Sequence, residues 1–309
     1  MEENPTLYRY RACGLNIVSE LVCPELSPYS GNGSDFDIRI SIGRVSDCLV
    51  GAVYEDWFSQ VKPGAYLLKL DEIAKYLAID GKEIIIDPVA GCPEDVIRLY
   101  LFSRGFGVLL HQRGCLILHA SAIASDRGAL VFLGPSGVGK STLAAGLIQA
   151  GYQILADDLC AIGYSSDEEL QVVPALAQLR LWNETLQQLD YDRQTMKRVW
   201  NREDKYTQYL QEFLASHPSK LHGIYLLDPA DVSAVSMISL TKVEQFQALM
   251  SNIFRVEYIK GLGVREQIFR QISRVLESSQ VKRLERPRGY FSLNQVIEGL
   301  ENDIARTTP

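Results

Sequence analysis

A glycine-rich segment that ends in lysine, serine and threonine has the residue types needed to hold the phosphates of a nucleotide. It follows an apolar run, residues 130–133, and fits the pattern G-x-x-x-x-G-K-[ST] at every position. Its glycines permit positive φ angles, so consecutive backbone N–H groups can point at phosphate oxygens. Lys140 can then reach the β- and γ-phosphates of ATP, and the Ser141 hydroxyl can ligate Mg²⁺. The expected nucleotide-binding residues are Gly134, Pro135, Ser136, Gly137, Val138, Gly139, Lys140, Ser141 and Thr142.

A carboxylate pair, Asp157-Asp158, follows soon after this loop. One acid could hold Mg²⁺ while the other takes a proton from an attacking hydroxyl, the division of labour that phosphoryl transfer needs. The spacing alone does not decide which acid has which role. The alternatives are that the pair only begins a turn and that the loop is a tight strand–helix connection that binds nothing.

These residues need neighbouring strands that end at one edge of a sheet. The apolar run before the loop reads as a buried strand, and Lys140 to Ala150 reads as a helix that Gly151 stops. Residues 152–156 read as the next strand and lead straight into the acid pair. In a parallel sheet both strands would end at the edge where ligands bind, which places the acids beside the loop. The helix N-terminus adds its positive dipole end to the same anion site.

Three runs of the sequence, at 118–121 (LHAS), 134–141 (GPSGVGKS) and 155–158 (LADD), together resemble the catalytic domain of the HPr kinase/phosphorylase family. The resemblance covers roughly residues 93 to 158. It implies an α/β fold similar to phosphoenolpyruvate carboxykinase, with a P-loop kinase core, and a serine kinase that uses ATP and Mg²⁺. It also implies roles for single residues. His119 assists the reaction, Lys140 binds phosphate, Asp157 acts as the base, and Ser141 with Asp158 holds the metal.

Two features of the bifunctional members of that family are missing. Residues 172–182 contain no acid where those enzymes have a stretch of the form E-[IL]-R-G-L-G, and their C-terminal glycine/arginine segment is also absent. The resemblance therefore favours a kinase with little phosphorylase activity. What remains of the pattern is similar to the kinases of bacterial lasso-peptide gene clusters. Those kinases phosphorylate the C-terminal serine of the precursor peptide. A peptide or protein serine is thus the expected phosphoryl acceptor.

Three other functions compete with this one. An HPr-type kinase/phosphorylase would share the motifs. A nucleotide-switch ATPase without an acceptor would usually place its metal-binding acid on a more distant strand than the one that carries Asp157. A carboxykinase-like enzyme would need cationic carboxylate clamps and a transition-metal site, and neither is recognisable in the sequence.

Composition limits the kind of protein further. The chain has 309 residues, of which 47% are hydrophobic and 22% charged, as in an ordinary folded protein. A net charge of −7 argues against a nucleic-acid partner, which usually meets a basic face. No apolar run approaches the ~18 residues of a membrane span, and the start lacks the profile of a signal peptide. Six cysteines without Cys-x-x-Cys spacing suit a reducing cytosol. We expect a cytoplasmic protein with no membrane partner.

The first part of the chain is rich in strand patterns and has no catalytic set of residues. The patterns occur at 7–11, 15–19, 36–42, 66–70 and, as a hairpin around Asp80-Gly81, at 76–87. We therefore expect a small β-rich N-terminal domain at 1–92 and a catalytic domain at 93–309. The N-terminal domain could pack on the catalytic core, present the substrate or mediate a homo-oligomer.

Residues 93–112 predict a helix that is apolar almost all round, which is typical of a buried element, and we expect it to link the two domains. Strands at 115–119, which ends in His119, and at 129–133 should follow it. Later in the chain, 206–215 reads as a helix. The basic segment 190–205 is either a solvated surface or a lid that excludes water from the phosphoryl group. Arg255 and Lys260 are candidate phosphate contacts, with surface roles as the alternative.

Overall fold

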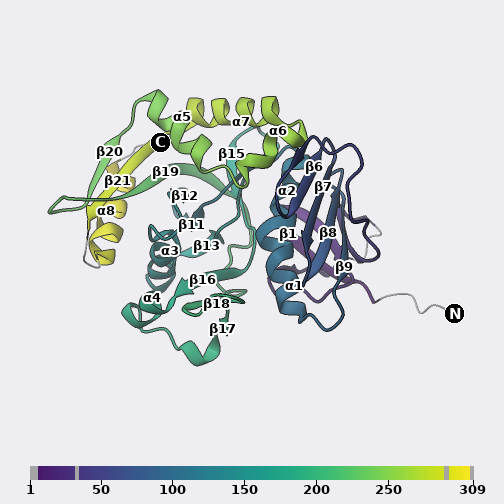
Figure 1. Ribbon diagram of the computed structural model, residues 1–309. Helices are drawn as coiled ribbons and strands as arrows, with labels where there is room; N and C mark the ends of the chain where they lie inside the picture. The colour runs from purple at the N-terminus through teal and green to yellow at the C-terminus, as the bar shows by residue number, and fades with distance from the viewer. Residues whose placement is uncertain (1–5, 32–34, 289–291, 307–309) are drawn as a thin grey trace. The chain divides into compact units, whose positions relative to one another are not determined.

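The computed structural model describes residues 6–31, 35–288 and 292–306. These residues form a mixed α/β protein with several β-sheets (Figure 1). Contacts between Cα atoms divide the chain into two compact units. One comprises Met1–Ile117 with Phe254–Arg270, and the other comprises Leu118–Ile253 with Gln271–Pro309. The domain division at residue 92 stays a prediction. The compact units differ from it because residues 93–117 and 254–270 group with the N-terminal strands.

The first unit contains a nine-stranded sheet in the order β3-β1-β2-β4-β9-β8-β7-β6-β5. The pairs β2–β4 and β4–β9 are parallel. In β8, alternate residues are buried, as expected of a strand that packs one face on a core. The strands are β1 (Tyr8–Ala12), β2 (Leu15–Ser19), β3 (Ser27–Pro28), β4 (Ile38–Ile42), β5 (Tyr54–Glu55), β6 (Ser59–Lys62), β7 (Ala65–Leu70), β8 (Ala74–Ile79) and β9 (Glu83–Pro88).

The predicted helix at 93–112 is present but is not a regular α-helix throughout. It comprises α1 (Glu94–Tyr100), a π-helical turn (Leu101–Gly105) and α2 (Phe106–Gln112). It contacts strands of the first unit's sheet, and the Tyr76 hydroxyl donates to the Ile97 carbonyl oxygen at 2.9 Å. Because of these contacts the helix belongs to the first unit. Two short helical segments, Val256–Tyr258 and α6 (Ile259–Leu262), belong to the same unit.

The main sheet of the second unit runs β14-β15-β19-β12-β11-β13, and β21 pairs with both β19 and β20. The expectation of a parallel sheet was wrong, because β11 runs antiparallel to both β12 and β13. Strand β11 was not predicted from the sequence. Since β11 opposes both neighbours, β12 and β13 still point the same way and end at the same edge. The strands are β11 (Ser121–Ser125), β12 (Gly128–Leu133), β13 (Gln153–Ala156), β14 (Cys160–Tyr164), β15 (Leu170–Val173), β19 (Ser219–Ala230), β20 (Ser236–Ser239) and β21 (Val281–Pro287). The division of the chain between the two units falls within a further strand, β10 (Leu116–Leu118).

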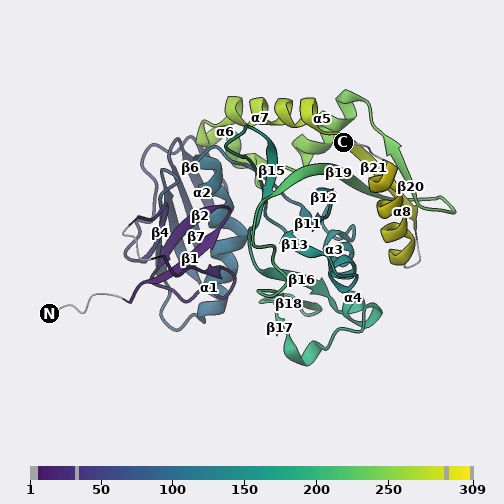
Figure 2. The same cartoon turned by 180° about the vertical axis from the view of Figure 1, so that it is seen from behind.

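Helix α3 (Lys140–Gln149) is buried on two sides, which fixes its N-terminus firmly. Its residues Leu143 and Leu147 pack with β12, β19, β21 and α8 (Leu293–Arg306) in one core cluster. On the other side Ala144 and Ile148 pack with β13, β16 (Gln178–Trp182) and α4 (Asn183–Gln188) in a second cluster. Figure 2 shows α3 flanked by α8 on one side and by β16 and α4 on the other.

A small three-stranded sheet, β16-β18-β17, lies beyond α3. It overturns the predicted helix at 206–215, because β18 (Lys205–Tyr209) pairs with β16 and with β17 (Lys197–Arg198). This pairing joins segments far apart in the chain, so local pattern did not reveal it. Helix α5 (Lys242–Ser251) begins with a capping box formed by Thr241 and Glu244. Another long helix, α7 (Arg265–Ser278), precedes β21 in the chain. Among the described residues, no helix is long and apolar enough to cross a membrane.

Candidate active site

The glycine-rich loop, residues 134–139, connects β12 to α3 as the motif requires. Gly134, Gly137 and Gly139 have φ angles of 140°, 85° and 104°, which confirms the expected positive values. At Gly134 a Cβ atom would lie 2.9 Å from Cγ1 of Val138, so a larger residue would also collide with the loop. Gly139 is the N-cap of α3 in the left-handed region. Glycine is the residue that adopts these conformations without strain.

Lys140 lies folded back on the loop rather than in solvent. Its Nζ donates to the carbonyl oxygens of Gly134 at 2.7 Å and Pro135 at 3.2 Å. The residue is only 5% exposed. Burial lowers the pKa of the Lys140 amine, against the opposing effect of the acid pair. The Lys140 amine is therefore held against the loop that leads into α3 in the nucleotide-free protein.

Asp157 is buried and bonded to the first turn of α3. Its Oδ1 accepts from the Ser121 hydroxyl at 2.6 Å and from the Ser141 hydroxyl at 2.9 Å. Its Oδ2 accepts from the backbone N–H of Arg180 at 3.3 Å. Burial, with the neighbouring charge of Asp158, raises the pKa of Asp157 to about 6. The structure thus places Asp157, rather than Asp158, against the predicted metal ligand Ser141.

Asp158 points elsewhere, into a cavity beside the loop. Its φ angle of 65° is unusual for a non-glycine residue and separates the directions of the two carboxylates. The Oδ2 atom lies 3.6 Å from a guanidinium nitrogen of Arg180, and Oδ1 lies 3.9 Å from Nδ1 of His119. Burial alone would raise the pKa of Asp158, but Arg180, Lys205 and the other nearby cations hold it below its usual range. Asp158 is therefore an ionised carboxylate open to a ligand.

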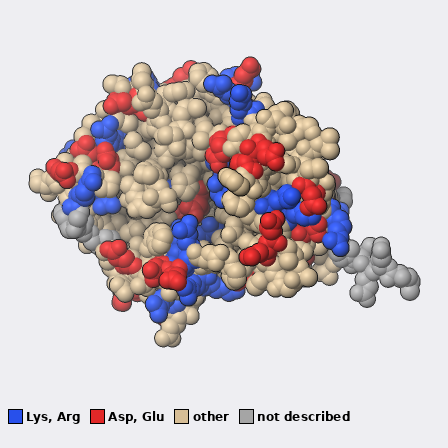
Figure 3. Space-filling view, viewed as in Figure 1, with Lys and Arg blue, Asp and Glu red and all other residues tan. Residues whose placement is uncertain are grey.

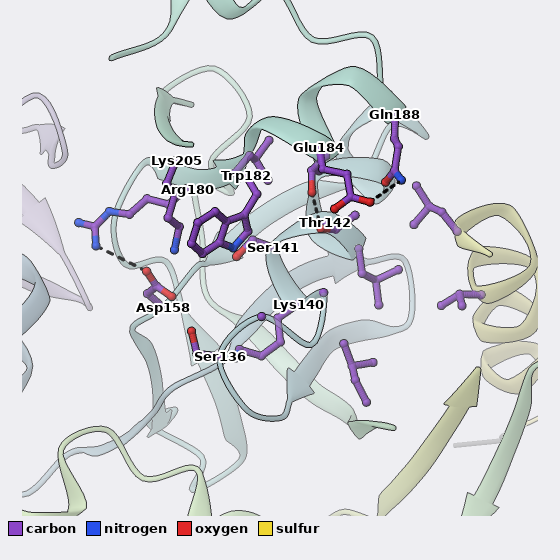
Figure 4. A pocket seen from close by; sticks show the side chains of 18 of the residues that line it. Ser136, Lys140, Ser141, Thr142, Asp158, Arg180, Trp182, Glu184, Gln188 and Lys205 are labelled. Atoms are coloured by element: carbon purple, nitrogen blue, oxygen red, sulfur yellow. Dashed lines mark hydrogen bonds and ion pairs between the residues drawn. The ribbon is translucent and has the colours of Figure 1, made fainter. Parts of the chain in front are cut away.

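The cavity has a volume of about 400 Å³ and lies entirely within the second unit. This size falls within the ~300–1,000 Å³ typical of small-molecule sites. At one end, called here the Asp158 end, it is lined by His119, Asp158, Arg180 and Lys205. The middle is formed by Ser136, Gly137, Gly139, Lys140, Ser141 and Thr142. Figure 4 shows Asp158, Arg180 and Lys205 on one side of Lys140, and Glu184 and Gln188 on the other.

Several cations of the cavity were not predicted from the sequence. Arg180 has a side chain only 10% exposed and comes from β16. Lys205 lies over the ring of Trp182, with Nζ 5.4 Å from the ring centroid. Arg286 of β21 donates to the Val138 carbonyl oxygen at 3.0 Å, and burial lowers its pKa. No local motif marks these residues, because each reaches the loop from a distant part of the chain.

The predicted cations Arg255 and Lys260 belong to residues counted with the first unit. Arg255 lies 3.8 Å from the Glu257 carboxylate and donates to the carbonyl oxygen of Ser103. Neither residue lines the cavity that the described residues form around the loop. The phosphate contacts predicted for Arg255 and Lys260 are therefore not supported by the lining of this cavity.

The basic segment 190–205 leads into the small sheet. It contains a 3₁₀ turn (Arg193–Thr195) and β17, and both are exposed or half-buried. Figure 3 shows basic side chains gathered over this part of the face. Only Lys205, at the end of the segment, lines the cavity. Most of the segment is thus a solvated surface, and a lid role stays a prediction.

The donor atoms near Ser141 fit Mg²⁺ better than a softer metal. Ser141, Asp157 and Asp158 offer hydroxyl and carboxylate oxygens at the start of α3. In the described part of the chain, no group of three or more His, Cys, Asp or Glu residues could hold a metal alone. Mg²⁺ is usually held by one or two carboxylates together with phosphate oxygens and waters. These residues therefore suit a magnesium ion that arrives with a nucleotide.

Asn252 ties the loop to His119, the residue that directly follows β10. Its buried Oδ1 accepts from the Gly134 N–H at 2.9 Å, and its backbone carbonyl accepts from the His119 N–H at 2.7 Å. We expect Asn252→Ala to lower the free energy of unfolding by about 1–3 kcal/mol, because the Gly134 N–H would be left buried without an acceptor. Urea denaturation measures this loss. Asn183→Ala, which removes only a 3.4 Å contact to Arg193, is the control, and an equal loss in both variants would contradict the role.

The raised pKa of Asp157 predicts how stability changes with pH in the nucleotide-free protein. Its ordinary value is 3.8, so between about pH 4 and pH 6 the folded state binds more protons than the unfolded state. The contribution of Asp157 to the free energy of unfolding is therefore fully present below pH 4 and is lost as the pH rises through 6. Asp157→Asn cannot ionise, so relative to wild type it should gain on the order of 1–3 kcal/mol from pH 4 to pH 7. Urea unfolding at stepped pH tests this, and a constant or opposite difference would refute it.

No protein-family model matches this sequence, and a comparison with curated proteins finds no match. Among solved structures, the chain is similar to the Hpr(Ser) kinase/phosphatase from Coxiella burnetii. The sequence identity is 14%, and the match covers 62% of this chain and 97% of that chain, with a TM-score of 0.34.

Proposed function

We propose that this protein is an ATP- and Mg²⁺-dependent kinase that transfers the γ-phosphoryl group to a serine hydroxyl of a peptide or protein. One observation carries the proposal. A lysine held in the glycine-rich loop, a serine on the first turn of α3 and the carboxylate of Asp158 line one cavity, and the buried carboxylate of Asp157 is hydrogen-bonded to that serine. Phosphoryl transfer needs little else from the protein than such positioned charges.

Each residue would take a distinct part. The loop N–H groups would hold the phosphates, and Lys140 would exchange its two carbonyl partners for β- and γ-phosphate oxygens. Mg²⁺, when bound, would neutralise phosphate charge. Ser141 would ligate it, with Asp157 orienting the serine through their 2.9 Å hydrogen bond. Arg180 and Lys205 would stabilise negative charge on the transferred group.

The two acids offer a choice of base, and we assign that role to Asp158. The family resemblance implies Asp157 as base, with Asp158 at the metal. However, Asp157 is 3% exposed and its Oδ1 already accepts from two hydroxyl groups. Asp158 lines the cavity, where an acceptor hydroxyl could reach it. His119, 3.9 Å from Asp158, would help to orient that carboxylate or share its proton.

The acceptor we favour is a flexible peptide that ends in serine, such as the C-terminal serine of a lasso-peptide precursor. The resemblance implies this class of acceptor. The charges at the Asp158 end support it, because Arg180 and Lys205 could bind a terminal carboxylate next to the reacting hydroxyl. A homo-oligomer remains a prediction.

Peptides that differ only at the terminal carboxylate test this proposal. With labelled ATP, a peptide ending in free serine should be phosphorylated faster than the same peptide ending in serine amide. Equal rates would contradict the carboxylate contact. Release of labelled phosphate at a rate independent of any peptide would instead support the ATPase alternative. Pyrophosphate formed from phosphopeptide and orthophosphate would point to the bifunctional alternative.

A further inference from the structure

The cavity has a second end whose chemistry differs from that of the Asp158 end. This α8 end has apolar walls and a polar rim. Figure 4 shows its labelled rim residues across the loop from Asp158 and Arg180. The residues that line it are Leu227, Leu293, Val296, Thr185, Glu184 and Gln188.

The direction of a bound triphosphate follows from the loop. The proposed function requires the γ-phosphate beside Asp158, where transfer occurs. Lys140 of a phosphate loop reaches the β- and γ-phosphates, while the backbone cradles the α- and β-phosphates. The α-phosphate must then lie on the other side of Lys140, toward Thr142. Thr142 is joined to α4 there, because its hydroxyl lies 3.0 Å from the hydroxyl of Thr185. Whatever the α-phosphate carries therefore extends into the α8 end.

The α8 end has the character of a site for a largely apolar organic group. Leu293 and Val296 are 9% and 3% exposed and belong to the core cluster that includes α3. Leu293 packs so closely on Gly146 of α3 that a Cβ atom there would collide with it, so this wall is fixed. Ligand sites are mostly apolar with a few placed polar groups. Here the polar groups are Glu184 and Gln188, one helical turn apart on α4 and hydrogen-bonded at 3.4 Å.

We propose that the α8 end binds the nucleoside of the phosphate donor, an inference that rests on the proposed function. Leu293 and Val296 pack against a face of the base. Gln188 forms a hydrogen bond with the base edge, since its amide offers both a donor and an acceptor. The nucleoside thus adds affinity that the triphosphate alone does not have.

Calorimetric titration of the full chain with Mg²⁺-ATP and with Mg²⁺-tripolyphosphate tests the inference. Wild type should bind both and should bind ATP at least tenfold more tightly. Val296→Ala should weaken ATP about three- to tenfold, as expected for the loss of buried apolar contact, and leave tripolyphosphate unchanged. The control is Leu300→Ala on the same helix, which is 1% exposed in the same core but does not line the cavity. It should not change the ratio of the two affinities.

A second pair of variants avoids the core entirely. Gln188 and Gln187 are adjacent, both exposed, and only Gln188 lines the cavity. Gln188→Ala should weaken ATP about two- to tenfold, and Gln187→Ala should have no effect. Equal affinities of wild type for ATP and tripolyphosphate would overturn the nucleoside site while leaving the phosphate site intact. Failure of wild type to bind tripolyphosphate would overturn the proposed function itself, and the inference with it.

Discussion

Replacing Lys140 by alanine should lower the rate of phosphoryl transfer more than a hundredfold. The reason is that Lys140 is the cation held within the loop, where its Nζ donates to the Gly134 and Pro135 carbonyl oxygens. Loss of this charge from the transition state should cost on the order of 3 kcal/mol. Transfer of label from ATP to a serine peptide measures the effect, and titration with ATP should show weaker binding.

Because Lys140 is buried, its removal could also disturb the loop, so a second variant is needed. Lys140→Met keeps most of the side-chain length without the charge and should lose activity to the same extent, with a thermal unfolding midpoint close to wild type. Lys197→Ala, at an exposed position of β17, is the control and should be fully active. More than about a tenth of wild-type turnover in Lys140→Met would refute the assignment of the loop.

Asp158→Asn should lower transfer about 10²–10⁴-fold and leave ATP affinity within a few-fold of wild type. Asparagine keeps the size of aspartate but removes the basic oxygen that takes the serine proton. Asp158 is the acid that faces the cavity, so the loss should appear in kcat rather than in nucleotide binding. Rates measured with saturating peptide and ATP, together with ATP titration, separate these two effects.

The neighbouring acid supplies the matched comparison. Asp157→Asn should raise the Mg²⁺ concentration needed for half-maximal activity, because Asp157 supports Ser141 through their hydrogen bond. Activity should recover in part at high Mg²⁺. If Asp157→Asn abolishes transfer at every Mg²⁺ concentration while Asp158→Asn shifts the Mg²⁺ requirement, the roles are those that the family resemblance implies.

The parts of the site that the sequence predicted are those close together in the chain. Loop, helix start and acid pair all fall between residues 134 and 158, where the spacing of glycines and apolar runs describes the local structure. The positive φ angles of the three loop glycines follow from the same local pattern. The shared edge of β12 and β13 was also expected, although the intervening β11 was not.

The parts that could not be predicted depend on contacts between distant segments. Arg180, Asn252 and Arg286 reach the loop region through side chains and sheet pairings that no motif marks. The segment 206–215 has a pattern that suits a helix, yet its first residues pair with β16 as a strand. The roles of the two acids were open for the same reason, because the direction of each carboxylate depends on the backbone at Asp158 and on Ser121 and Ser141.

The most direct test of the central claim follows the γ-phosphorus of ATP by ³¹P NMR, with Mg²⁺ and a peptide that ends in serine. The account predicts that the γ-phosphate resonance is replaced by that of phosphoserine, with one ADP formed for each phosphopeptide, and that Lys140→Met abolishes the change. Orthophosphate as the only product, or ATP left unchanged in the presence of every serine peptide offered, would contradict it.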